Sequence, residues 1–383
     1  MIAVAVVMGT RPEAVKLAPV IAALRARPDS FTCLTVATAQ HRELLDQVLA
    51  TFAIRPDVDL DIMSQGQPLS RVAALVLERL DPVLVRERPD WVLVQGDTTT
   101  VMAAALAAFH RGARVGHVEA GLRTGDRRNP FPEEINRRVA DVVADLHFAP
   151  TEGARQALLR EGVPAWRVSV TGNTVIDALL TVAAQPAPPP PEPLAAVWNT
   201  DRRLVLVTAH RRESFGAPLR EMLLAVRDLA EVFRADTTLV YPVHPNPNVT
   251  GPAREVLGAS PNVMLLPPLG YAEFVHLMRR STLILTDSGG IQEEAPSLGK
   301  PVLVMRAVTE RPEGVAAGTA LVVGTERAHI VGAAARLLTD PAAYGRMAGA
   351  ANPYGDGKAA ARIADLIQAH HERREGAPGG PGS

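Results

Sequence analysis

The sequence predicts an α/β fold with two successive domains, and three observations support this prediction. Short apolar runs alternate with segments of helical periodicity along almost the whole chain, a pattern typical of parallel sheets covered by helices. The alternation starts again after a proline-dense segment at 185–193. The chain has 383 residues, enough for two domains. Because glycines and polar residues follow the apolar runs in both halves, we expect two Rossmann-like domains facing across a ligand cleft.

Composition and charge exclude several classes of protein. Hydrophobic residues make up 47% of the chain and the net charge is −1, so nothing indicates a nucleic-acid or membrane surface as partner. The single cysteine, Cys33, excludes a disulfide framework and a multi-cysteine metal site. The apolar N-terminus lacks a basic segment and breaks at Gly9, which predicts a buried strand rather than a signal peptide. No apolar run has the length of a membrane span, and we expect a soluble, cytoplasmic protein.

In the first half, each predicted strand is a short apolar run that ends at a glycine or a polar residue. We expect these strands at 2–8, 31–37, 58–60, 91–94, 115–118, 147–150 and 168–170. Helical segments follow from about 12, from about 40, at 68–87, from 98, at 135–144, at 152–161 and at 175–184. The alternation of single strands with single helices predicts a parallel sheet.

The second half repeats this order. Strands are expected at 204–208, 239–243, 263–266, 283–286 and 301–305, and helices at 218–234 and 271–280. The prolines of 185–193 exclude a helix interior or a central strand there and indicate a surface connection. The crossover between domains is expected just earlier, near Gly172, so we place a first domain at 1–172 and a second at 173–357, with the proline segment as a loop of the second. A last helix at 358–373 is expected to pack back on the first domain, and the tail 374–383 is expected to be disordered.

Three carboxylates in the window 95–134 are candidates for proton transfer. Asp97 and Glu119 follow two successive predicted strands, and Glu133 lies just before the next helix. Residues past the carboxyl ends of parallel strands line the ligand crevice of such sheets, and no lysine lies near these acids in the sequence. Their position favours general acid–base chemistry. In the alternative interpretation, Asp97 caps the following helix and Glu119 pairs with Arg123.

A strand–glycine–helix turn near the N-terminus predicts an anion site. Gly9 ends the first apolar run, and the helix after it offers free backbone N–H groups and a positive dipole. Arg11 and Lys16 add two cations near this helix N-terminus. The turn is not a GxGxxG fingerprint, so a dinucleotide cofactor is not indicated.

The sharpest single motif is the segment 286–294, where an apolar strand ends in Ser-Gly-Gly and a helix begins. Gly289 and Gly290 let a phosphate approach the backbone, and Ser288 supplies a hydroxyl beside the positive helix end. Glu294, one turn into the helix, is placed to accept hydrogen bonds from both hydroxyls of a ribose. The alternative is an ordinary helix capped by one of its first polar residues.

Three further side chains fit a phosphate-facing role. His210 follows a buried strand beside two arginines, which makes it a candidate proton donor to a departing phosphate oxygen. A lone histidine is more often structural, but the position of His210 at a strand end beside two arginines favours an anion-facing role. His244 is similarly placed. Arg311 can hold a diphosphate through its fork of donors or can pair with Glu310 or Glu313. No HxxxH, HExxH or Gly-x-Ser-x-Gly pattern is present, so neither a metal site nor a serine hydrolase is indicated.

Six of these segments, taken in order, resemble the bacterial non-hydrolysing UDP-N-acetylglucosamine 2-epimerases. They are Gly9-Thr10-Arg11-Pro12-Glu13, Gln95-Gly96-Asp97, His117-Val118-Glu119-Ala120-Gly121-Leu122-Arg123, Pro132-Glu133-Glu134-Ile135-Asn136-Arg137, His210-Arg211-Arg212-Glu213 and Asp287-Ser288-Gly289-Gly290. The resemblance covers about residues 2–372. It implies the fold of the B-type glycosyltransferases, with UDP held mainly by the second domain and a homodimer built through the first.

The resemblance also implies a reaction. UDP-GlcNAc and UDP-ManNAc would interconvert without metal or nicotinamide, by elimination of UDP to 2-acetamidoglucal and its re-addition, supplying ManNAc for surface polysaccharides. The resemblance implies that Asp97, Glu119 and Glu133 transfer protons at C2 and that His210 assists the departure of UDP. Phe274 would lie beside the uracil. The residues implied to bind UDP are Arg11, Lys16, Ser288, Gly289, Gly290, Glu294 and Arg311. A second, activating UDP-GlcNAc is assigned to Gln40, Gln47, Arg211 and His244.

Three other functions stay open at the level of sequence. A glycosyltransferase would need one catalytic base and an acceptor groove, and three acids at strand ends exceed that need. A hydrolysing epimerase would release free ManNAc and is usually fused to a kinase domain, for which no residues are left. A nucleotide-sugar sensor would need none of the proposed catalytic groups.

Overall fold

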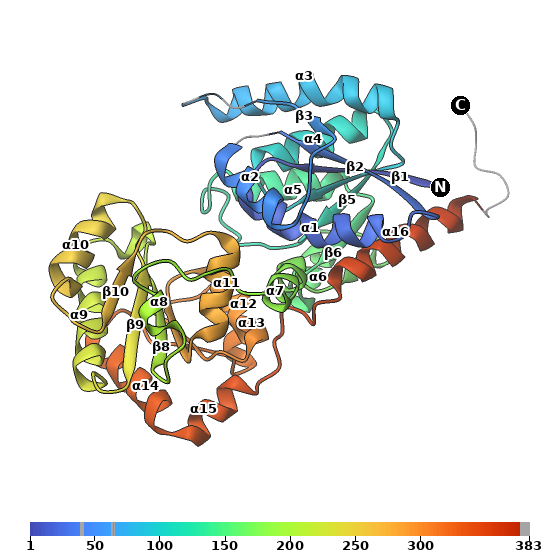
Figure 1. Cartoon of the computed structure of the whole chain (residues 1–383). Helices are drawn as coiled ribbons and strands as arrows, with labels where there is room; N and C mark the ends of the chain where they lie inside the picture. The colour runs from blue at the N-terminus through green and yellow to red at the C-terminus, as the bar shows by residue number, and fades with distance from the viewer. Residues whose placement is uncertain (39–41, 63, 65, 376–383) are drawn as a thin grey trace. The chain divides into compact units, whose positions relative to one another are not determined.

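A computed structural model describes residues 1–38, 42–62, 64 and 66–375 of the chain (Figure 1). Their contacts form two compact units: unit 1 is Met1–Ala178 with the segment from Gly355 onward, and unit 2 is Leu179–Tyr354. The first division falls inside helix α7 (Thr174–Ala184), later than the predicted boundary at 172. Asn173 donates a hydrogen bond to Glu119, which ties the start of α7 to unit 1.

Among the described residues, unit 1 has a seven-stranded parallel sheet in the order β3-β2-β1-β4-β5-β6-β7. Its strands are β1 (Ile2–Met8), β2 (Phe31–Ala37), β3 (Val58–Asp59), β4 (Trp91–Gln95), β5 (Arg114–Val118), β6 (Leu146–Ala149) and β7 (Val168–Val170). The strand order reverses between β1 and β4, and in such sheets ligands bind beyond the carboxyl ends at this point. The segments after β1 and β4 are the Gly9 turn and the Asp97 turn.

Helices cover both faces of this sheet. They are α1 (Arg11–Arg25), α2 (Arg42–Thr51), α3 (Leu69–Glu87), α4 (Thr99–His110), α5 (Glu133–Val143), α6 (Glu152–Arg160) and α16 (Ala359–Glu375). Side chains of α3, α4 and α5 share one buried apolar cluster with β1, β4 and β5. Figure 1 shows α3 and α4 on one side of the strands and α1 with α16 on the other.

The last helix, α16, packs against unit 1. It lies beside α1, and its His370 ring meets the edge of Trp91 at 5.4 Å. Asp177 of α7 accepts hydrogen bonds from the backbone N–H groups of Ala359 and Ala360 at the helix start. The helix continues through Glu375, slightly past its predicted end at 373, and the rest of the predicted tail, 376–383, lies outside the described residues.

Unit 2 repeats the arrangement, and its described residues form a six-stranded parallel sheet in the order β10-β9-β8-β11-β12-β13. The strands are β8 (Arg203–Thr208), β9 (Thr237–Pro242), β10 (Val263–Leu266), β11 (Leu283–Thr286), β12 (Val302–Val304) and β13 (Ala320–Val322). The order reverses between β8 and β11, which carry the His210 turn and the Ser288 turn. Two Rossmann-like domains, as predicted, are confirmed.

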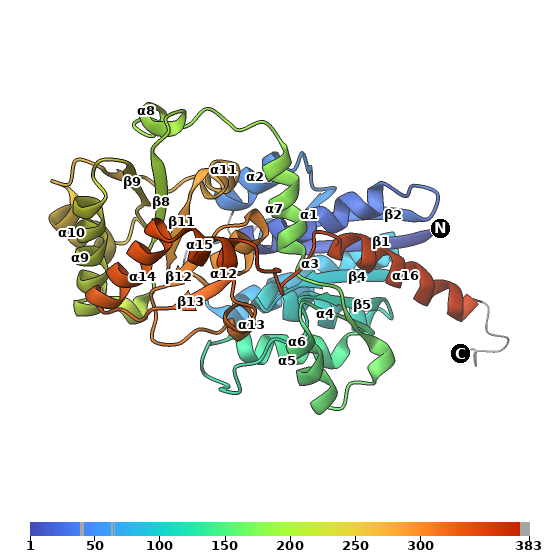
Figure 2. The ribbon, with the colours of Figure 1, turned by 90° about the horizontal axis from the view of Figure 1, so that it is seen from below.

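The helices of unit 2 include several that the sequence did not predict. The helices of this unit are α8 (Ala195–Trp198), α9 (Ala217–Val232), α10 (Pro247–Leu257), α11 (Tyr271–Arg280), α12 (Gly289–Glu294), α13 (Pro312–Ala316), α14 (Arg327–Thr339) and α15 (Pro341–Ala348). Figure 2 shows α9 and α10 side by side, and α9 also packs against α14. Helix α10 was missed because Gly251 and Pro252 interrupt it. Burial of Val249, Ala253 and Leu257 against α9 and β9 stabilises it nonetheless.

Candidate active site

Glu119 lies just after β5 with its backbone in the left-handed region, at φ 64°. Only 6% of its side chain is exposed. A residue other than glycine in this conformation stores about 1–3 kcal/mol of strain, which surrounding contacts must offset. Gly121, two residues on, has φ 89°, and a Cβ there would lie 2.3 Å from the carbonyl oxygen of Ala154. The turn after β5 is therefore held in one shape.

Three side chains from separate elements hold the Glu119 carboxylate. Lys16 Nζ, from α1, lies 2.5 Å from Oε1. Asn173 Nδ2, after β7, donates to the same oxygen at 2.9 Å, and Gln95 Nε2, at the end of β4, donates to Oε2. These donors offset the cost of burying a charged group and fix its orientation.

These contacts correct two sequence-based interpretations. No lysine lies near these acids in the sequence, but Lys16 pairs with Glu119 across 103 positions of the chain, a separation that a local pattern cannot reveal. The alternative partner for Glu119, Arg123, instead contacts Asp141 and Glu161, each at 2.7 Å. Glu119 is therefore not a surface ion pair.

Asp97 follows β4 and does not cap the next helix. The N-cap of α4 is Thr98, whose hydroxyl accepts a hydrogen bond from the Val101 N–H group. Asp97 pairs instead with Arg137 of α5, and 27% of its side chain is exposed. Asn136 Nδ2 donates to the Asp97 backbone carbonyl at 3.0 Å. The helix-capping interpretation is wrong, and the carboxylate is left beside the strand ends.

Glu133 and Glu134 begin α5 but lie in different surroundings. Glu133 is half-buried, and its Oε2 atom is buried yet accepts no hydrogen bond from any described residue. Glu134 is fully buried and accepts hydrogen bonds from the backbone N–H groups of Thr124 at 3.0 Å and Gly125 at 3.3 Å. Glu134 thus holds the segment before α5, whereas Glu133 keeps an unused acceptor.

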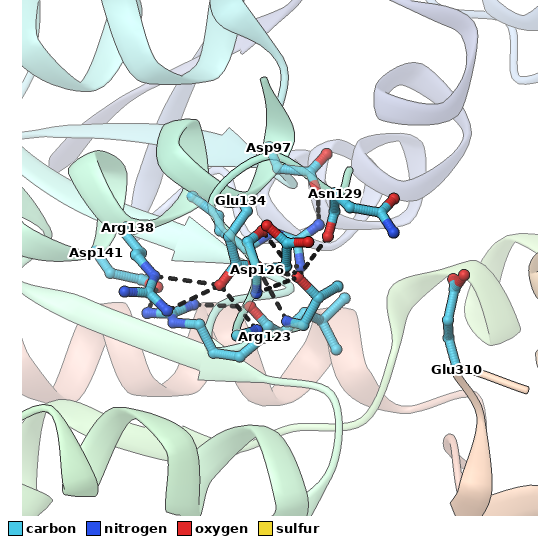
Figure 3. A network of polar contacts seen from close by, with 12 residues as sticks. Asp97, Arg123, Asp126, Asn129, Glu134, Arg138, Asp141 and Glu310 are labelled. Atoms are coloured by element: carbon cyan, nitrogen blue, oxygen red, sulfur yellow. Dashed lines mark hydrogen bonds and ion pairs between the residues drawn. The ribbon is translucent and has the colours of Figure 1, made fainter. Parts of the chain in front are cut away.

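A charged network supports this part of unit 1. Figure 3 shows Arg123 and Arg138 near Glu134 and Asp141, with Arg138 Nη2 2.9 Å from Glu134 Oε1 and Arg123 Nη2 2.7 Å from Asp141 Oδ2. Burial raises the pKa of Glu134. Hydrogen bonds from the Thr124 N–H group and from Arg138 lower it, and the net direction is down. The network fixes the segment that connects β5 to α5.

His117 of β5 lies at the end of this network. Its Nδ1 is 2.6 Å from Asp141 Oδ1 and its Nε2 is 2.7 Å from the Gly96 carbonyl oxygen. Because both ring nitrogens face acceptors, both must carry a proton. Burial lowers the pKa of His117, but the Asp141 carboxylate and the Gly96 carbonyl oxygen together raise it by more, so the net direction is up. A buried imidazolium therefore holds Gly96, the residue before Asp97.

The Gly9 turn, where an anion site is predicted, is held by a carboxylate of α1. The buried Glu13 carboxylate accepts hydrogen bonds from the Gly9 N–H group at 2.6 Å and from the Thr10 hydroxyl at 3.0 Å. The Gly9 N–H group is therefore engaged by Glu13, and an anion at the following N–H groups of α1 stays a prediction. A Cβ at Gly9 would lie 2.4 Å from Thr38 Oγ1, so the position needs glycine. Arg11 begins α1 and is half-buried.

In unit 2, His210 lies between a carboxylate and a second histidine. Its backbone N–H group donates to Asp287 Oδ2 at 2.7 Å, and its Nδ1 is 3.5 Å from Asp287 Oδ1. The ring of His210 stacks on that of His244, with centroids 5.5 Å apart and planes at 9°. Burial lowers the pKa of His210, as do His244 and Arg211, while Asp287 raises it; the net direction is down.

Two arginines converge on the glycine turn after β11. A Cβ at Gly289 would lie 3.5 Å from Arg211 Nη2 and 3.9 Å from the guanidinium carbon of Arg311. Arg311 Nε pairs with Glu293, a partner that neither sequence interpretation anticipated. The Tyr354 hydroxyl donates to the Arg311 carbonyl at 3.2 Å. The structure thus brings together three predicted residues, Gly289, Arg211 and Arg311.

The remaining predicted nucleotide residues lie on α11 and α12. Ser288 is the N-cap residue of α12, and within the described residues its hydroxyl makes no capping hydrogen bond. Glu294 lies beside Gly290, where a Cβ would be 3.5 Å from Glu294 Oε1. Phe274 is half-buried in the first turns of α11.

The residues predicted for a second ligand are only partly described. Gln40 lies outside the described residues. Gln47 is exposed on α2 of unit 1, and Arg211 and His244 belong to unit 2. Within unit 2, both residues lie beside His210.

Several functional neighbours were not predicted as site residues. Gln95, Asn173 and Asp287 each follow or end a strand at a carboxyl edge, so the rule that selected Asp97 and Glu119 applies to them too. Arg137 carried no such signal, because its contact with Asp97 depends on how α5 packs.

Two further observations concern the described residues only. They contain no group of three or more histidine, cysteine, aspartate or glutamate side chains arranged to hold a metal ion. None of their helices combines the length and the apolar character needed to cross a membrane.

Comparison with known proteins agrees with this arrangement. A family model described as UDP-N-acetylglucosamine 2-epimerase matches residues 22–368. The chain belongs to the UDP-N-acetylglucosamine 2-epimerase family. The resemblance inferred from the ordered motifs is thereby confirmed, and so is the prediction of an enzyme of this kind.

Individual members of the epimerase family align over nearly the whole chain. The UDP-N-acetylglucosamine 2-epimerase of Yersinia pestis is 53% identical over 369 residues, which cover 95% of this chain and 98% of the relative. A crystal structure of the putative Listeria monocytogenes epimerase matches with a TM-score of 0.91 at 48% identity, covering 97% of each chain. The Neisseria meningitidis epimerase bound to UDP-GlcNAc matches with a TM-score of 0.85 at 45% identity, covering 96% of this chain and 99% of that one. These matches confirm the B-type glycosyltransferase fold.

Proposed function

We propose that this chain interconverts UDP-GlcNAc and UDP-ManNAc by eliminating and re-adding UDP. In the forward direction a carboxylate takes the proton from C2, and the C1–O bond breaks with its electron pair leaving on UDP. This gives 2-acetamidoglucal. A proton delivered to the other face of C2, with return of the UDP oxygen to C1, completes the epimerisation. The observation that supports the proposal is the pair of carboxylates after neighbouring strands of one sheet, Asp97 held by Arg137 and Glu119 held by three donors, with Glu133 at the start of α5 as a third acid.

Unit 1 supplies the groups for proton transfer. Glu119 is fixed by three donors, and Asp97 is held by Arg137. Glu133 has an Oε2 atom that accepts no hydrogen bond within the described residues and so has capacity to accept a proton. A proton must leave one face of C2 and another must arrive on the opposite face. The reaction therefore needs more than one acid–base group.

Unit 2 supplies the groups for UDP. Arg211 and Arg311, which converge near Gly289, are suited to a diphosphate because guanidinium donors match phosphate oxygens. His210 is proposed to give a proton to the departing oxygen. Ser288 and Gly290 would bind the phosphates, Glu294 the ribose hydroxyls, and Phe274 would lie beside the uracil.

The contacts of Lys16 suggest a different role for this residue, whereas the other predictions below are unchanged. Lys16 pairs with Glu119, and we propose that it positions this acid. The predicted contacts of Lys16 and Arg11 with UDP stay predictions. The supply of ManNAc to surface polysaccharides, the homodimer, the cytoplasmic location and the activating UDP-GlcNAc also stay predictions.

A proton NMR time course of the protein with UDP-GlcNAc in deuterium oxide tests the proposal. We expect UDP-ManNAc to appear with deuterium at C2, and deuterium to enter recovered UDP-GlcNAc as well. Free ManNAc would indicate a hydrolase. Unchanged UDP-GlcNAc without deuterium would contradict the epimerase reaction and leave a sensor or a transferase.

A further inference from the structure

We propose that Asp287 is a positioning residue for His210, which it holds with Nδ1 protonated so that Nε2 can serve the departing UDP oxygen. The inference rests on the role proposed for His210 and adds a group that the sequence motifs left without a task. Asp287 is completely buried. It follows β11, the strand that pairs with β8, and Thr286 and Thr208 are register partners at the ends of these two strands.

One oxygen of Asp287 anchors the backbone of the His210 turn. Oδ2 accepts hydrogen bonds from the N–H groups of His210 at 2.7 Å and of Arg211 at 2.8 Å. The hydroxyl groups of Thr208 and Thr286 lie 2.6 Å apart directly before the two turns. These contacts hold the backbone of His210 against the carboxylate.

The other oxygen faces the imidazole. Oδ1 is buried, accepts no hydrogen bond from any described residue, and lies 3.5 Å from His210 Nδ1. A small rotation of the His210 ring would turn this contact into a hydrogen bond from Nδ1–H. A carboxylate in this place favours a proton on Nδ1 and stabilises the imidazolium that is needed to donate a proton from Nε2.

The remaining neighbours of His210 do not compete for Nδ1. His244 stacks on the flat face of its ring, and His244 Nδ1 itself accepts a hydrogen bond from the Asn246 N–H group at 3.1 Å. Arg211 contributes a repelling charge. Among these groups Asp287 is the one negative charge, and it is the contact that can keep His210 protonated when burial and the neighbouring Arg211 oppose it.

Asp287→Asn separates positioning from simple anchoring. Two backbone N–H groups require an acceptor, so the amide oxygen must take the place of Oδ2. The amide NH₂ group then faces His210 Nδ1, which can only accept, and the imidazolium is disfavoured. A matched control is Asp177→Asn, since buried Asp177 likewise accepts two backbone N–H hydrogen bonds, from Ala359 and Ala360, but has no histidine partner in those contacts.

The experiment measures deuterium exchange at C2 against pH, UDP affinity by calorimetry, and thermal unfolding for the wild type and both variants. We expect Asp287→Asn to lower turnover roughly 10²–10⁴-fold, the range for loss of acid–base assistance, with UDP affinity little changed. The loss of rate at high pH should move to lower pH. Asp177→Asn should change stability and leave the pH profile as in the wild type.

Nitrogen NMR of the His210 ring, read in the UDP complex, gives a second measurement that needs no turnover. We expect Nδ1 to carry the proton of the neutral wild-type ring and the pKa of His210 to fall in Asp287→Asn. An Nε2-protonated wild-type ring or an unchanged pKa in the variant would overturn the inference, even if Asp287→Asn is slow. If instead the wild type shows no exchange at C2 while the NMR results are as expected, the proposed reaction fails and the His210–Asp287 contact stands.

Discussion

The two units share a strand order and differ in the charges at the carboxyl edge of their sheets. In unit 1 the order around the reversal is β2-β1-β4-β5 and in unit 2 it is β9-β8-β11-β12. At the edge of unit 1 the candidate reactive groups are acids, and cations such as Lys16 and Arg137 hold them. At the edge of unit 2 the candidates are arginines and a histidine, and a buried acid, Asp287, holds the histidine turn.

This inversion shows what the fold does and does not decide. A parallel sheet brings the residues after its strands to one edge whatever their type. The chemistry depends on which residues stand there and on which partners hold them. Acids handle C–H protons and cations handle diphosphates, so the two edges suit the two halves of the proposed reaction.

The largest effect that would test this division is expected at Glu119. Glu119→Gln keeps the size of the side chain but cannot take up a proton, so turnover should fall roughly 10²–10⁴-fold while UDP affinity stays near that of the wild type. Deuterium exchange at C2 and calorimetry measure the two quantities. Glu152→Gln, on an exposed side chain of α6, is the control. An equal loss of UDP affinity would break the division between the two edges.

Asp97→Asn should behave in the same way as Glu119→Gln. If Asp97 were only a helix cap, asparagine would replace it without effect, because it caps a helix as well as aspartate does. The cap of α4 is Thr98, so there is no such reason to expect a silent substitution. Combined with Glu119→Gln, the losses should be strongly non-additive because groups that serve one proton transfer act as a unit. Fully additive losses would indicate two independent roles.

The next effect concerns stability and its dependence on pH. Because the pKa of His117 is raised in the folded protein, its pairing with Asp141 stabilises fully below the unfolded pKa of about 6.5 and is lost as pH rises through the folded pKa. The pKa of Asp141 is lowered, since His117 and Arg123 outweigh the effect of its burial. Its contribution is therefore present above the unfolded pKa of about 4 and lost as pH falls.

His117→Gln should lower the free energy of unfolding by roughly 3–5 kcal/mol between pH 4 and 6.5, the cost of removing one partner of a buried pair. The difference from the wild type should shrink as pH rises. Denaturant unfolding at a series of pH values measures it, with His329→Gln, on a side chain that is 68% exposed, as the control. A difference that grows with pH would show that His117 is neutral in the folded protein.

A smaller effect should appear at the edge of unit 2. Glu294→Ala removes the proposed contacts with the ribose hydroxyls and should weaken UDP binding by about 1.5–3 kcal/mol, typical of hydrogen bonds to a charged group. Calorimetry with UDP measures the change, and Glu231→Ala, on an exposed position of α9, serves as control. Unchanged UDP affinity in a folded variant would remove α12 from the nucleotide site.

The smallest effect sharpens the comparison, because it concerns a strand-end residue to which the proposed reaction assigns no role. Thr151 follows β6 at the same edge as Glu119, and its hydroxyl caps α6 by accepting from the Ala154 N–H group at 3.2 Å. Thr151→Ala should cost about 1 kcal/mol of stability and leave turnover unchanged, and Thr151→Ser should restore the stability. Thermal unfolding and the exchange assay check both. A loss of turnover would show that position at the edge is itself enough to affect the reaction.

Most elements of the fold were predictable because their signals are local. β1, β2, β7, β10, β11 and α11 lie at the predicted residues, since a buried parallel strand is a continuous apolar run. Helix α10 was not predictable, because Pro247, Gly251 and Pro252 weaken the local pattern and the packing on α9 outweighs it.

By itself, the sequence determined which candidate groups stand at the strand ends. Asp97, Glu119, His210 and Gly289 could be named because a strand followed by glycine or a charged residue is a pattern within a few positions, and the order of such patterns determined the family. Only the tertiary structure decided how these groups are held. The pairs Lys16–Glu119 and Arg137–Asp97 join distant segments, and the strain at Glu119 depends on its backbone conformation. A contact between residues far apart in the chain arises from packing of whole elements, and no local pattern records it.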